Sequence, residues 1–313
     1  MREQTDLCGV LLLDKPAGVT SHDMVGFVRR MYGTRQVGHA GTLDPMATGV
    51  LPVMVGRMTK LSSLLSDHDK RYQAFLTLGL TTDTGDITGQ VLTRSALIPD
   101  RKAVEMAVSS FSGPILQVPP MVSAIKRNGQ KLVDLARKGV EVAREPREVI
   151  IHSISCQPTD DPSVYRLDVY CGKGTYIRTL CEDIGAKLGC GGTMSALRRT
   201  AVDRFSIEQC VTKDCVESAD PDSRIRFLLS PEQCFPDWPA FCPPPFYERL
   251  LKNGCAVRTD KIGLAHVTYP HVLLVDSSGI CYAVADILPG EDGPVLKIHA
   301  LLRLDPSAHT DRL

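Results

Sequence analysis

The chain has 313 residues, of which 43% are apolar and 23% charged, and its 36 basic and 36 acidic side chains give a net charge of zero. These proportions are typical of a globular protein with one large and one small domain, and they exclude a disordered or fibrous chain. Because the bulk charge is neutral, a nucleic-acid partner would have to be recognised by a local cluster of cations.

Cysteine usage and apolar runs bear on the location of the protein. The eleven cysteines include no Cys-x-x-Cys pair and no paired Cys/His cluster, so we expect reduced thiols and neither a disulfide framework nor a metal site. The N-terminal apolar run, residues 10–13, stops at Asp14 and is too short for a signal segment. No run approaches the roughly 18 apolar residues of a membrane span. A cytoplasmic protein without a membrane segment is predicted.

The first residues predict a strand followed by a helix. Residues 9–14 are apolar enough for a buried strand, and a Lys-Pro-Ala-Gly turn follows it. Thr20 or Ser21 then begins a helix whose apolar side chains recur at helical spacing until Gly33. Lys15, at the end of the strand, is either a packing residue or a cation turned towards a site.

The next loop, residues 38–51, holds a single carboxylate, Asp44, among glycines, small residues and aliphatic side chains. Burial disfavours the charged form of a carboxylate, so Asp44 needs a cation from elsewhere in the chain or a raised pKa. Gly41 and Gly49 permit tight backbone and Pro45 restricts it, which predicts a rigid loop. An Asx-type turn, in which Asp44 caps its own backbone, is the alternative to a reactive group.

Residues 70–79 alternate with a period of two and predict a strand on which Tyr72 leads an apolar face. Tyr72 is either a core residue or part of a pocket. The turn-rich residues 82–89 then predict a hairpin-like connection, in which Asp83 and Asp86 form turns.

Apolar periodicity predicts the remaining elements of the large domain. They are strands at residues 50–55, 150–156 and 165–171 and helices at residues 61–65, 103–111 and 177–188. On the strand at 150–156, the alternating face is Ile150, His152, Ile154 and Cys156. Arg178 opens the last helix but lies off its apolar stripe, where an arginine is ordinarily solvated.

A net-positive segment follows residue 124. Between Lys126 and Glu148 it carries seven basic and four acidic side chains, and Gly129 and Gly139 interrupt it. A mobile charged flap is predicted, with a solvated helix of offsetting charges as the alternative.

The composition changes at residues 218–245, where prolines accumulate. This predicts a linker, or a segment that wraps the large domain. A short helix at residues 246–251 and Val-rich strands at residues 267, 272–275, 282–287 and 295–302 indicate a small β module at the C-terminal end.

Five motifs resemble, in order, those of the TruB family of tRNA pseudouridine synthases, in its bacterial type. They are D-K-P-x-G-x-x-S at residues 14–21, G-H-x-G-x-L-D-P-x-A-x-G at 38–49, K-x-Y at 70–72, C-x-K-G-T-Y-I-R-x-L at 171–180 and L-R-R at 197–199. The resemblance implies an α+β fold with a mixed, mainly antiparallel sheet core flanked by helices and loops. It divides the chain into a catalytic domain at residues 1–240, with a thumb-like RNA-binding insertion at 124–148, and a PUA-like β domain at 241–313.

The resemblance also assigns roles to side chains. Asp44 would be the catalytic residue, acting as a nucleophile or as a proton-abstracting base, and Arg178 would pair with it. The slot for the target base would be formed by Tyr72, Tyr176 and Leu197. Tyr72 would also count among the catalytic residues. His39 would lie against the RNA, and Lys15 is a further substrate-binding candidate.

Four cations are assigned by the resemblance to the RNA backbone: Lys126, Arg127 and Arg137 of the thumb, and Arg198. Arg198 and Arg199 are expected to face RNA or acidic neighbours. Val122 and Val133 stand where the family usually has aromatic residues.

The implied activity is isomerisation of uridine to pseudouridine at position 55 in the TΨC arm of tRNA, by base flipping and without a metal or other cofactor. The expected partner is therefore tRNA, and the chain is expected to act as a monomer. Two other classes remain open. A non-catalytic RNA-binding or tRNA-folding protein would not need an Asp-Arg pair, and an aspartate-dependent hydrolase would need a second carboxylate or a metal beside Asp44.

Overall fold

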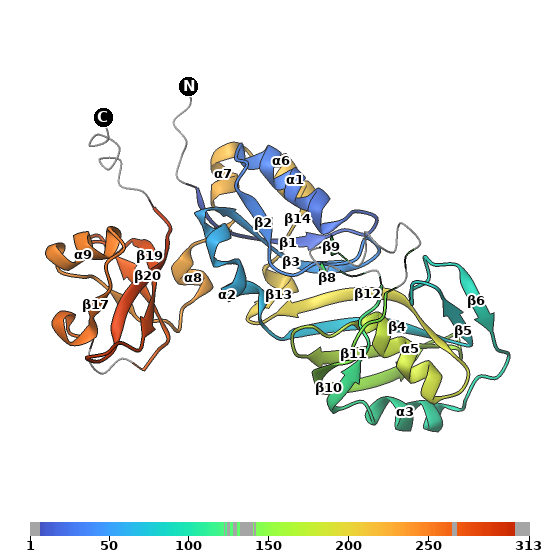
Figure 1. The fold of residues 1–313 in the computed structure, drawn as a ribbon. Helices are drawn as coiled ribbons and strands as arrows, with labels where there is room; N and C mark the ends of the chain where they lie inside the picture. The colour runs from blue at the N-terminus through green and yellow to red at the C-terminus, as the bar shows by residue number, and fades with distance from the viewer. Residues whose placement is uncertain are drawn as a thin grey trace.

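The computed structural model describes residues 7–121, 123, 126–127, 130–131, 140, 142–264 and 268–303 of the chain. Its largest feature is an 11-stranded sheet that runs through the large domain (Figure 1). The path through that sheet is β14 (Val211–Thr212), β1 (Cys8–Lys15), β3 (Thr48–Gly56), β12 (Gly192–Val202), β4 (Lys70–Leu78), β11 (Val164–Cys171), β10 (Arg147–Pro158) and β7 (Gly113–Gln117). Three short strands pair beside this path: β2 (Val37–His39), β13 (Phe205–Ser206) and β15 (Leu228–Leu229).

The strand directions confirm the predicted fold class. Among the described pairs of this sheet, β1 with β14 and β3 with β12 are parallel and the others are antiparallel. Helices α1 (Ser21–Tyr32) and α6 (Lys213–Ser218) pack over one end of the sheet, and α3 (Arg101–Ser109) and α5 (Ile177–Lys187) over the other (Figure 1). The protein is therefore a mixed α+β fold built on a mainly antiparallel sheet. The shorter helices are η1 (Arg57–Leu61), α2 (Ser62–Ser66), η2 (Ile207–Gln209), α7 (Pro221–Ile225), α8 (Pro231–Cys234) and η3 (Thr259–Ile262).

Helix α1 begins and ends as the sequence predicts. The Thr20 side chain accepts a hydrogen bond from the Asp23 amide, and the Asp23 carboxylate accepts one from the Thr20 amide, so the two form a capping box. Gly33 adopts φ = 64° directly after the last turn, the left-handed conformation that glycine favours at a helix end. The hairpin predicted after β4 is also present, as β5 (Leu80–Thr82) paired with β6 (Val91–Arg94).

Strand β10 corrects one prediction. The strand exists, but its buried side chains at the start are Val149 and Ile151, whereas Ile150 is 46% exposed. A register shift between Ile151 and Ser153 inserts one extra residue opposite β11, and after it Ile154 turns inward. The predicted face of alternating residues was therefore wrong for Ile150 and His152, because one bulged residue exchanges the two faces of a strand.

The proline-rich segment at residues 218–245 wraps the large domain. Its strand β15 pairs with β1, and the Tyr32 hydroxyl of α1 donates a hydrogen bond to the Arg224 carbonyl. Trp238 then stacks on Phe235 with ring centroids 4.0 Å apart. The sequence allowed a linker or a wrapping segment, and the structure shows the second.

A second sheet forms the C-terminal module, coloured orange to red in Figure 1. Its order is β16 (Ala240–Phe241), β18 (His271–Val275), β19 (Cys281–Leu288), β20 (Val295–Leu301) and β17 (Val257–Arg258), and α9 (Pro245–Lys252) lies beside it. The predicted strands are present, apart from Val267, which lies outside the described residues. The predicted boundary after residue 240 falls inside β16. Val284 of this sheet shares a buried cluster with Val10 and Met54 of the large sheet, so the two units pack together.

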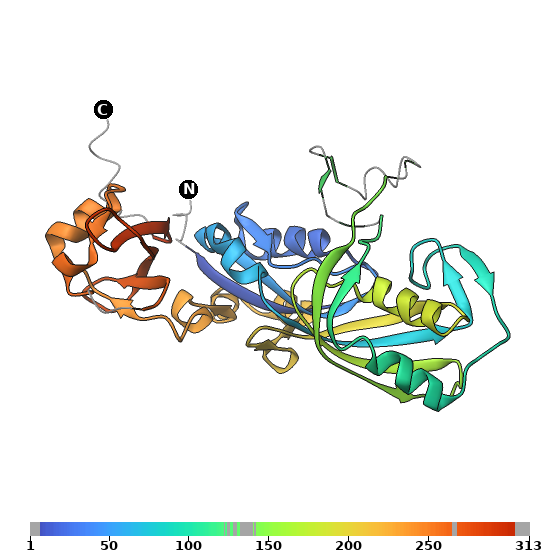
Figure 2. The same ribbon diagram turned by 60° about the horizontal axis from the view of Figure 1, so that its bottom comes forward.

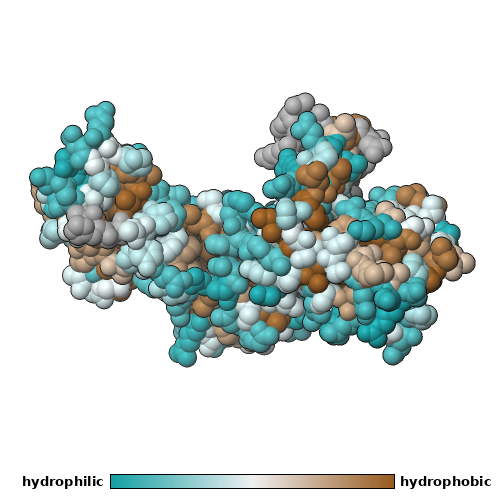
Figure 3. All heavy atoms as spheres, turned by 90° about the horizontal axis from the view of Figure 1, so that it is seen from below, coloured by the Kyte–Doolittle hydropathy of each residue, from teal (hydrophilic) through white to brown (hydrophobic). Residues whose placement is uncertain are grey.

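Part of the predicted thumb can be placed. Strands β8 (Lys126–Arg127) and β9 (Gln130–Lys131) pair with each other, and β10 and β7 rise from the sheet towards them (Figure 2). Val122, Val133 and Arg137 lie outside the described residues. Apolar side chains are exposed on the projecting strands and just beyond them, at Leu116, Val118 and Ile150. Figure 3 shows hydrophobic surface along this projection.

Close packing between α5 and β12 yields a stability prediction. A Cβ on Gly185 of α5 would lie 2.0 Å from the Gly192 nitrogen. We expect Gly185→Ala to lower the free energy of unfolding by about 2–3 kcal/mol, because the helix would have to move away from the sheet. Gly26→Ala in α1 is the matched control, since nothing lies within 4 Å of that position, and it should stabilise the protein by roughly 0.5–1 kcal/mol. Denaturant unfolding of both variants tests this, and equal effects would contradict it.

Candidate active site

Asp44 lies on a loop that is held by hydrogen bonds from residues at the start of α1 and just before it. The loop joins β2 to β3, and the Ser21 hydroxyl at the start of α1 accepts a hydrogen bond from the Leu43 amide at 2.8 Å and donates one to the Leu43 carbonyl at 3.1 Å. On the other side of the aspartate, the Gly18 amide donates to the Pro45 carbonyl at 2.8 Å. Both neighbours of Asp44 are thus fixed, so the carboxylate projects from a rigid support, as the sequence predicts.

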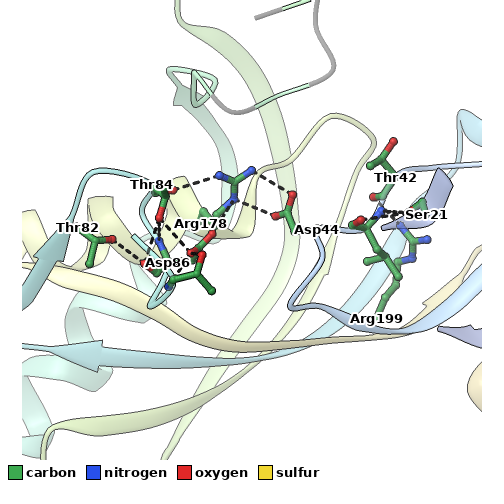
Figure 4. Close-up of polar contacts among 10 residues, drawn as sticks. Ser21, Thr42, Asp44, Thr82, Thr84, Asp86, Arg178 and Arg199 are labelled. Atoms are coloured by element: carbon green, nitrogen blue, oxygen red, sulfur yellow. Dashed lines mark hydrogen bonds and ion pairs between the residues drawn. The ribbon is translucent and has the colours of Figure 1, made fainter. Parts of the chain in front are cut away.

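Arg178 supplies the cation that the isolated carboxylate requires. Its Nε lies 2.9 Å from Asp44 Oδ2, and its Nη2 donates to Asp44 Oδ1 at 3.3 Å (Figure 4). The Arg178 side chain is only 5% exposed, whereas that of Asp44 is 29% exposed. The structure therefore brings together the two residues that were expected to pair. The guanidinium is buried behind the carboxylate, and one side of the carboxylate is left open.

A second acid, Asp86, lies behind Arg178 and was missed as part of the site. Its Oδ2 is 3.9 Å from Arg178 Nε, and the Thr84 carbonyl accepts a hydrogen bond from Arg178 Nη1 at 3.1 Å (Figure 4). The other oxygen of Asp86 accepts hydrogen bonds from the Thr88 amide and from the Thr84 hydroxyl, both at 3.0 Å. Asp86 is therefore a turn former, as predicted, and also a buried partner of the arginine. Its place in a turn-rich segment gave no sign of the second role.

The electrostatics of Asp44 follow from this arrangement. Burial raises the pKa of Asp44 above its ordinary value, and the Arg178 guanidinium opposes the rise. The Asp86 carboxylate adds to it, because two like charges share one guanidinium. The arginine thus offsets part of the cost of burying the carboxylate without cancelling it.

A cavity of about 580 Å³ opens beside the Asp44 carboxylate. The three residues predicted to form a base slot, Tyr72, Tyr176 and Leu197, all line it, together with Asp44 and Arg178. Burial raises the pKa of both tyrosine hydroxyls, so they remain protonated near neutral pH. The cavity therefore combines apolar and aromatic walls with the partly exposed Asp44 carboxylate.

Gln117, at the end of β7, is a second residue that sequence reasoning missed. Its side-chain oxygen accepts a hydrogen bond from the Tyr176 amide at 3.0 Å, and its amide group donates to the Tyr176 carbonyl at 3.2 Å. Gln117 is 1% exposed and also lines the cavity. It holds the main chain at the residue before α5, which carries Arg178, and so connects the base of the thumb to the site.

Two of the predicted substrate-binding residues lie outside the cavity lining. Lys15 is fully buried, and its Nζ donates to the carbonyls of Val19 at 2.6 Å and Pro45 at 3.2 Å. Burial lowers the pKa of Lys15 to about 8, and the Asp44 carboxylate opposes that shift. His39 is half-buried on β2, and burial lowers its pKa. Lys15 therefore supports the Asp44 loop from below, and contact of either residue with substrate stays a prediction.

The two adjacent arginines of β12 point to different places. Arg198 binds Asp14 with two hydrogen bonds, of 2.7 and 3.1 Å, and so meets the acidic neighbour that was one of its two expected partners. Arg199 is instead 1% exposed and directs its guanidinium at main-chain carbonyls of the Asp44 loop. No described acid forms an ion pair with Arg199, and its contact with RNA stays a prediction. The two arginines differ because successive residues of a strand point to opposite faces. The side chains of Lys126, Arg127 and Arg137 lie outside what the structure describes.

No group of three or more His, Cys, Asp or Glu side chains among the described residues is arranged to hold a metal ion. No described helix is long and apolar enough to cross a membrane.

Comparison with known sequences gives the family. Residues 29–177 match the model of the TruB family pseudouridylate synthase N-terminal domain, and residues 178–231 match that of the tRNA pseudouridylate synthase B C-terminal domain. The chain is 45% identical to tRNA pseudouridine synthase B of Syntrophotalea carbinolica over 286 residues, which is 90% of this chain and 92% of the relative. The chain belongs to the TruB family of pseudouridylate synthases. It is therefore an enzyme, as the motifs indicated.

Other relatives agree with this family. The protein of the same name in Nitrosococcus oceani is 46% identical, over 81% of this chain and 83% of its own. Among solved structures, a Cbf5-Nop10-Gar1 complex matches with a TM-score of 0.71 at 23% identity, covering 96% of this chain and 87% of that one. An H/ACA RNP bound to a substrate RNA containing 2'-deoxyuridine matches with a TM-score of 0.69 at 20% identity, covering 96% and 86%. At these identities the two structures show a shared fold.

The raised pKa of Asp44 predicts a pH-dependent stability. Between the ordinary value of 3.8 and the raised value, the folded chain binds the Asp44 proton more tightly than the unfolded chain does. The contribution of this group to stability is therefore fully present below 3.8 and is lost as the pH rises through the raised pKa. Denaturant unfolding of the wild type and of Asp44→Asn over this range should show the wild type losing stability relative to the variant. A difference that does not change with pH would contradict the prediction.

The position of Asp86 predicts a loss of rate. Asp86→Asn removes the second charge that faces Arg178, so we expect the rate at saturating substrate to fall roughly tenfold to a hundredfold through misplacement of the Arg178–Asp44 pair. Loss of the like charge should also lower the pKa of Asp44. Asp83→Asn is the matched control, because Asp83 is an exposed acid in the same turn. Its carboxylate accepts a hydrogen bond from the Gln90 amide at 2.7 Å. Similar rates for both variants would exclude a role for Asp86 in the site.

Proposed function

We propose that the enzyme isomerises uridine to pseudouridine in tRNA, at position 55 of the TΨC arm. The observation that carries the proposal is the Arg178–Asp44 pair, with Nε and Oδ2 2.9 Å apart, at the wall of a cavity lined by Tyr72, Tyr176 and Leu197. Relatives that are 42–50% identical over most of this chain are named tRNA pseudouridine synthase B, which supports tRNA as the substrate.

The proposed reaction needs no redox agent. The bond between uracil N1 and ribose C1′ breaks, a bond between C5 and C1′ forms, and the proton lost from C5 is balanced by one gained at N1. Asp44 is the group placed to start it, either as a nucleophile towards the sugar or as a base that abstracts a proton. In both roles the carboxylate must be ionised, and Arg178 favours that form.

The cavity suits a base that has been removed from its stack. Extruding a nucleotide from a folded loop costs on the order of a few kcal/mol, and stacking on aromatic side chains returns about 1–3 kcal/mol per base. Tyr72 and Tyr176 offer such surfaces, and Leu197 offers an apolar wall. In this proposal they hold the target base beside Asp44.

The positions of basic side chains suggest where the rest of the RNA lies in this proposal. Arg147 lines the cavity from the start of β10, at the foot of the thumb, and is exposed. With the thumb cations Lys126, Arg127 and Arg137 it would contact backbone phosphates, which fix position without reading sequence. Arg198 could join them from its pair with Asp14. Residues 1–240 would be the catalytic domain of a monomer, and residues 241–313 an accessory RNA-binding module.

Incubation with an unmodified tRNA transcript tests the proposal. We expect pseudouridine at position 55 with the wild-type enzyme and none with Asp44→Asn, although the variant should bind the transcript with an affinity within about threefold of wild type, because the amide is isosteric but cannot attack or accept a proton. Asp161→Asn, in the exposed turn between β10 and β11, is the control and should retain full rate.

Each outcome separates the alternatives. Product formed by Asp44→Asn would remove Asp44 from the mechanism, and product at another uridine would exclude the T-arm site. Tight binding without any product by the wild type would favour the rival function, a non-catalytic RNA-binding or tRNA-folding protein.

A further inference from the structure

Arg199, on β12, is the largest fully buried side chain in the described part of the chain. Its Nε donates to the Val50 carbonyl at 2.8 Å, and its Nη2 donates to the Gly41 carbonyl at 3.1 Å. Its Nη1 donates to the Thr42 carbonyl at 3.4 Å (Figure 4). Gly41 and Thr42 precede Asp44 in the chain, and Val50 follows it. One guanidinium therefore binds the main chain on both sides of the reactive loop.

The burial of this cation calls for an explanation. Removing a charged group from water is costly unless its donors are satisfied, and an apolar side chain would fill the same space without that cost. Among the described residues, no carboxylate forms an ion pair with Arg199, so carbonyl oxygens are its main partners. Guanidinium offers five donors in a fixed plane, which lets it reach three carbonyls that diverge from one another.

The loop is shaped to fit this side chain. Gly49 adopts φ = 104°, and a Cβ there would lie 2.1 Å from the Arg199 carbonyl oxygen. Gly41 adopts φ = 92°, and a Cβ there would lie 3.4 Å from Arg199 Nη1. Both glycines that frame Asp44 in the sequence therefore lie against this arginine, one against its main chain and one against its guanidinium.

Arg199 also reaches the cavity itself. It lines the same cavity as Asp44 and Tyr72. Its positive charge opposes the burial that raises the pKa of that tyrosine. The arginine thus connects the loop that carries the reactive carboxylate to one wall of the base slot.

We infer that Arg199 is a positioning residue for the isomerisation. By binding the main chain before and after Asp44, it fixes the loop so that the carboxylate meets Arg178 and the sugar of the bound nucleotide. This inference rests on the proposed function of Asp44 in tRNA uridine isomerisation. If Arg199 only filled the core, the reaction rate would not depend on its contacts with the loop, whereas a positioning residue makes the rate depend on them.

The chain offers a closely matched control in Arg224. Its guanidinium also binds three main-chain carbonyls, those of Val216 at 2.9 Å, Met31 at 3.3 Å and Glu217 at 3.0 Å, and these lie among α1, α6 and α7. Replacing either arginine with lysine keeps the charge but removes the three-way contact. A purely structural role predicts similar consequences for both variants, whereas a positioning role predicts a loss of rate at only one of them.

The test compares Arg199→Lys with Arg224→Lys, as full-length proteins, on an unmodified tRNA transcript. We expect Arg199→Lys to lower the single-turnover rate at saturating RNA by about tenfold to a hundredfold, with the RNA dissociation constant within about twofold of wild type. Arg224→Lys should keep the wild-type rate. Arg199→Gln, which retains amide donors without charge, serves as the second variant and should show the same separation of rate from affinity.

A double-mutant cycle with Ser21→Ala shows whether Arg199 acts through the loop. Ser21 holds the same loop independently, at Leu43. If both side chains position one loop, the combined loss of rate will be smaller than the product of the two single losses. Wild-type rates in both Arg199 variants, or equal rate losses in the Arg199 and Arg224 variants, would overturn the inference. An inactive wild type would instead overturn the proposed function.

Discussion

The contact between Arg178 and Asp44 joins two parts of the chain that share no local structure. Asp44 comes from a loop between two strands at one end of the sheet, and Arg178 from the first turn of a helix that packs over the other end. A contact of 2.9 Å between them requires that β3, β12 and β4 pair in the observed register and that α5 lies close against β12. The glycine contact between Gly185 and Gly192 permits that close approach. Packing far from the cavity therefore determines the geometry inside it.

Four buried polar side chains around the site bind main-chain groups. Lys15 and Ser21 bind the residues on either side of Asp44, Gln117 binds Tyr176, and Arg199 binds the loop that carries Asp44 from both ends. Each of these groups would be costly to bury without partners, and each finds its partners in backbone amides or carbonyls. The result is a rigid frame in which a carboxylate with an unfavourable environment is kept in place. Pre-organisation of this kind lowers the reorganisation needed when the reaction begins.

The environment of Asp44 disfavours its charged form. Burial raises its pKa, and Asp86 adds a like charge behind the arginine, so the carboxylate is held ionised against a real cost. Because Asp44 and Asp86 share the positive charge of Arg178, the charge of Asp44 is compensated less than it would be in an isolated ion pair. In the proposed reaction, such a group is available to attack the sugar or to accept a proton. The large buried clusters at the two ends of the sheet offset the stability that is lost at this position.

Local patterns in the sequence were sufficient for most of the regular structure. The capping box of α1, the alternating face of β4 and the helical stripe of α5 depend on residues a few positions apart, so composition and spacing predict them. The isolated carboxylate in a glycine-rich loop could likewise be recognised, together with its need for a distant cation. The motif resemblance then named Arg178 as that cation and named the family.

Only the tertiary structure decided what depends on contacts between distant segments. The bulge in β10 moved Ile150 to the exposed face, and no local pattern announces a single inserted residue. Asp86 became a partner of Arg178 because strand pairing carried its turn to the start of α5. Arg198 and Arg199 are adjacent in sequence and identical in chemistry, yet one binds an acid and the other is buried beneath the reactive loop. Because successive residues of a strand point to opposite faces, the two side chains must point in different directions. Only the packed sheet determines which of them points towards the Asp44 loop.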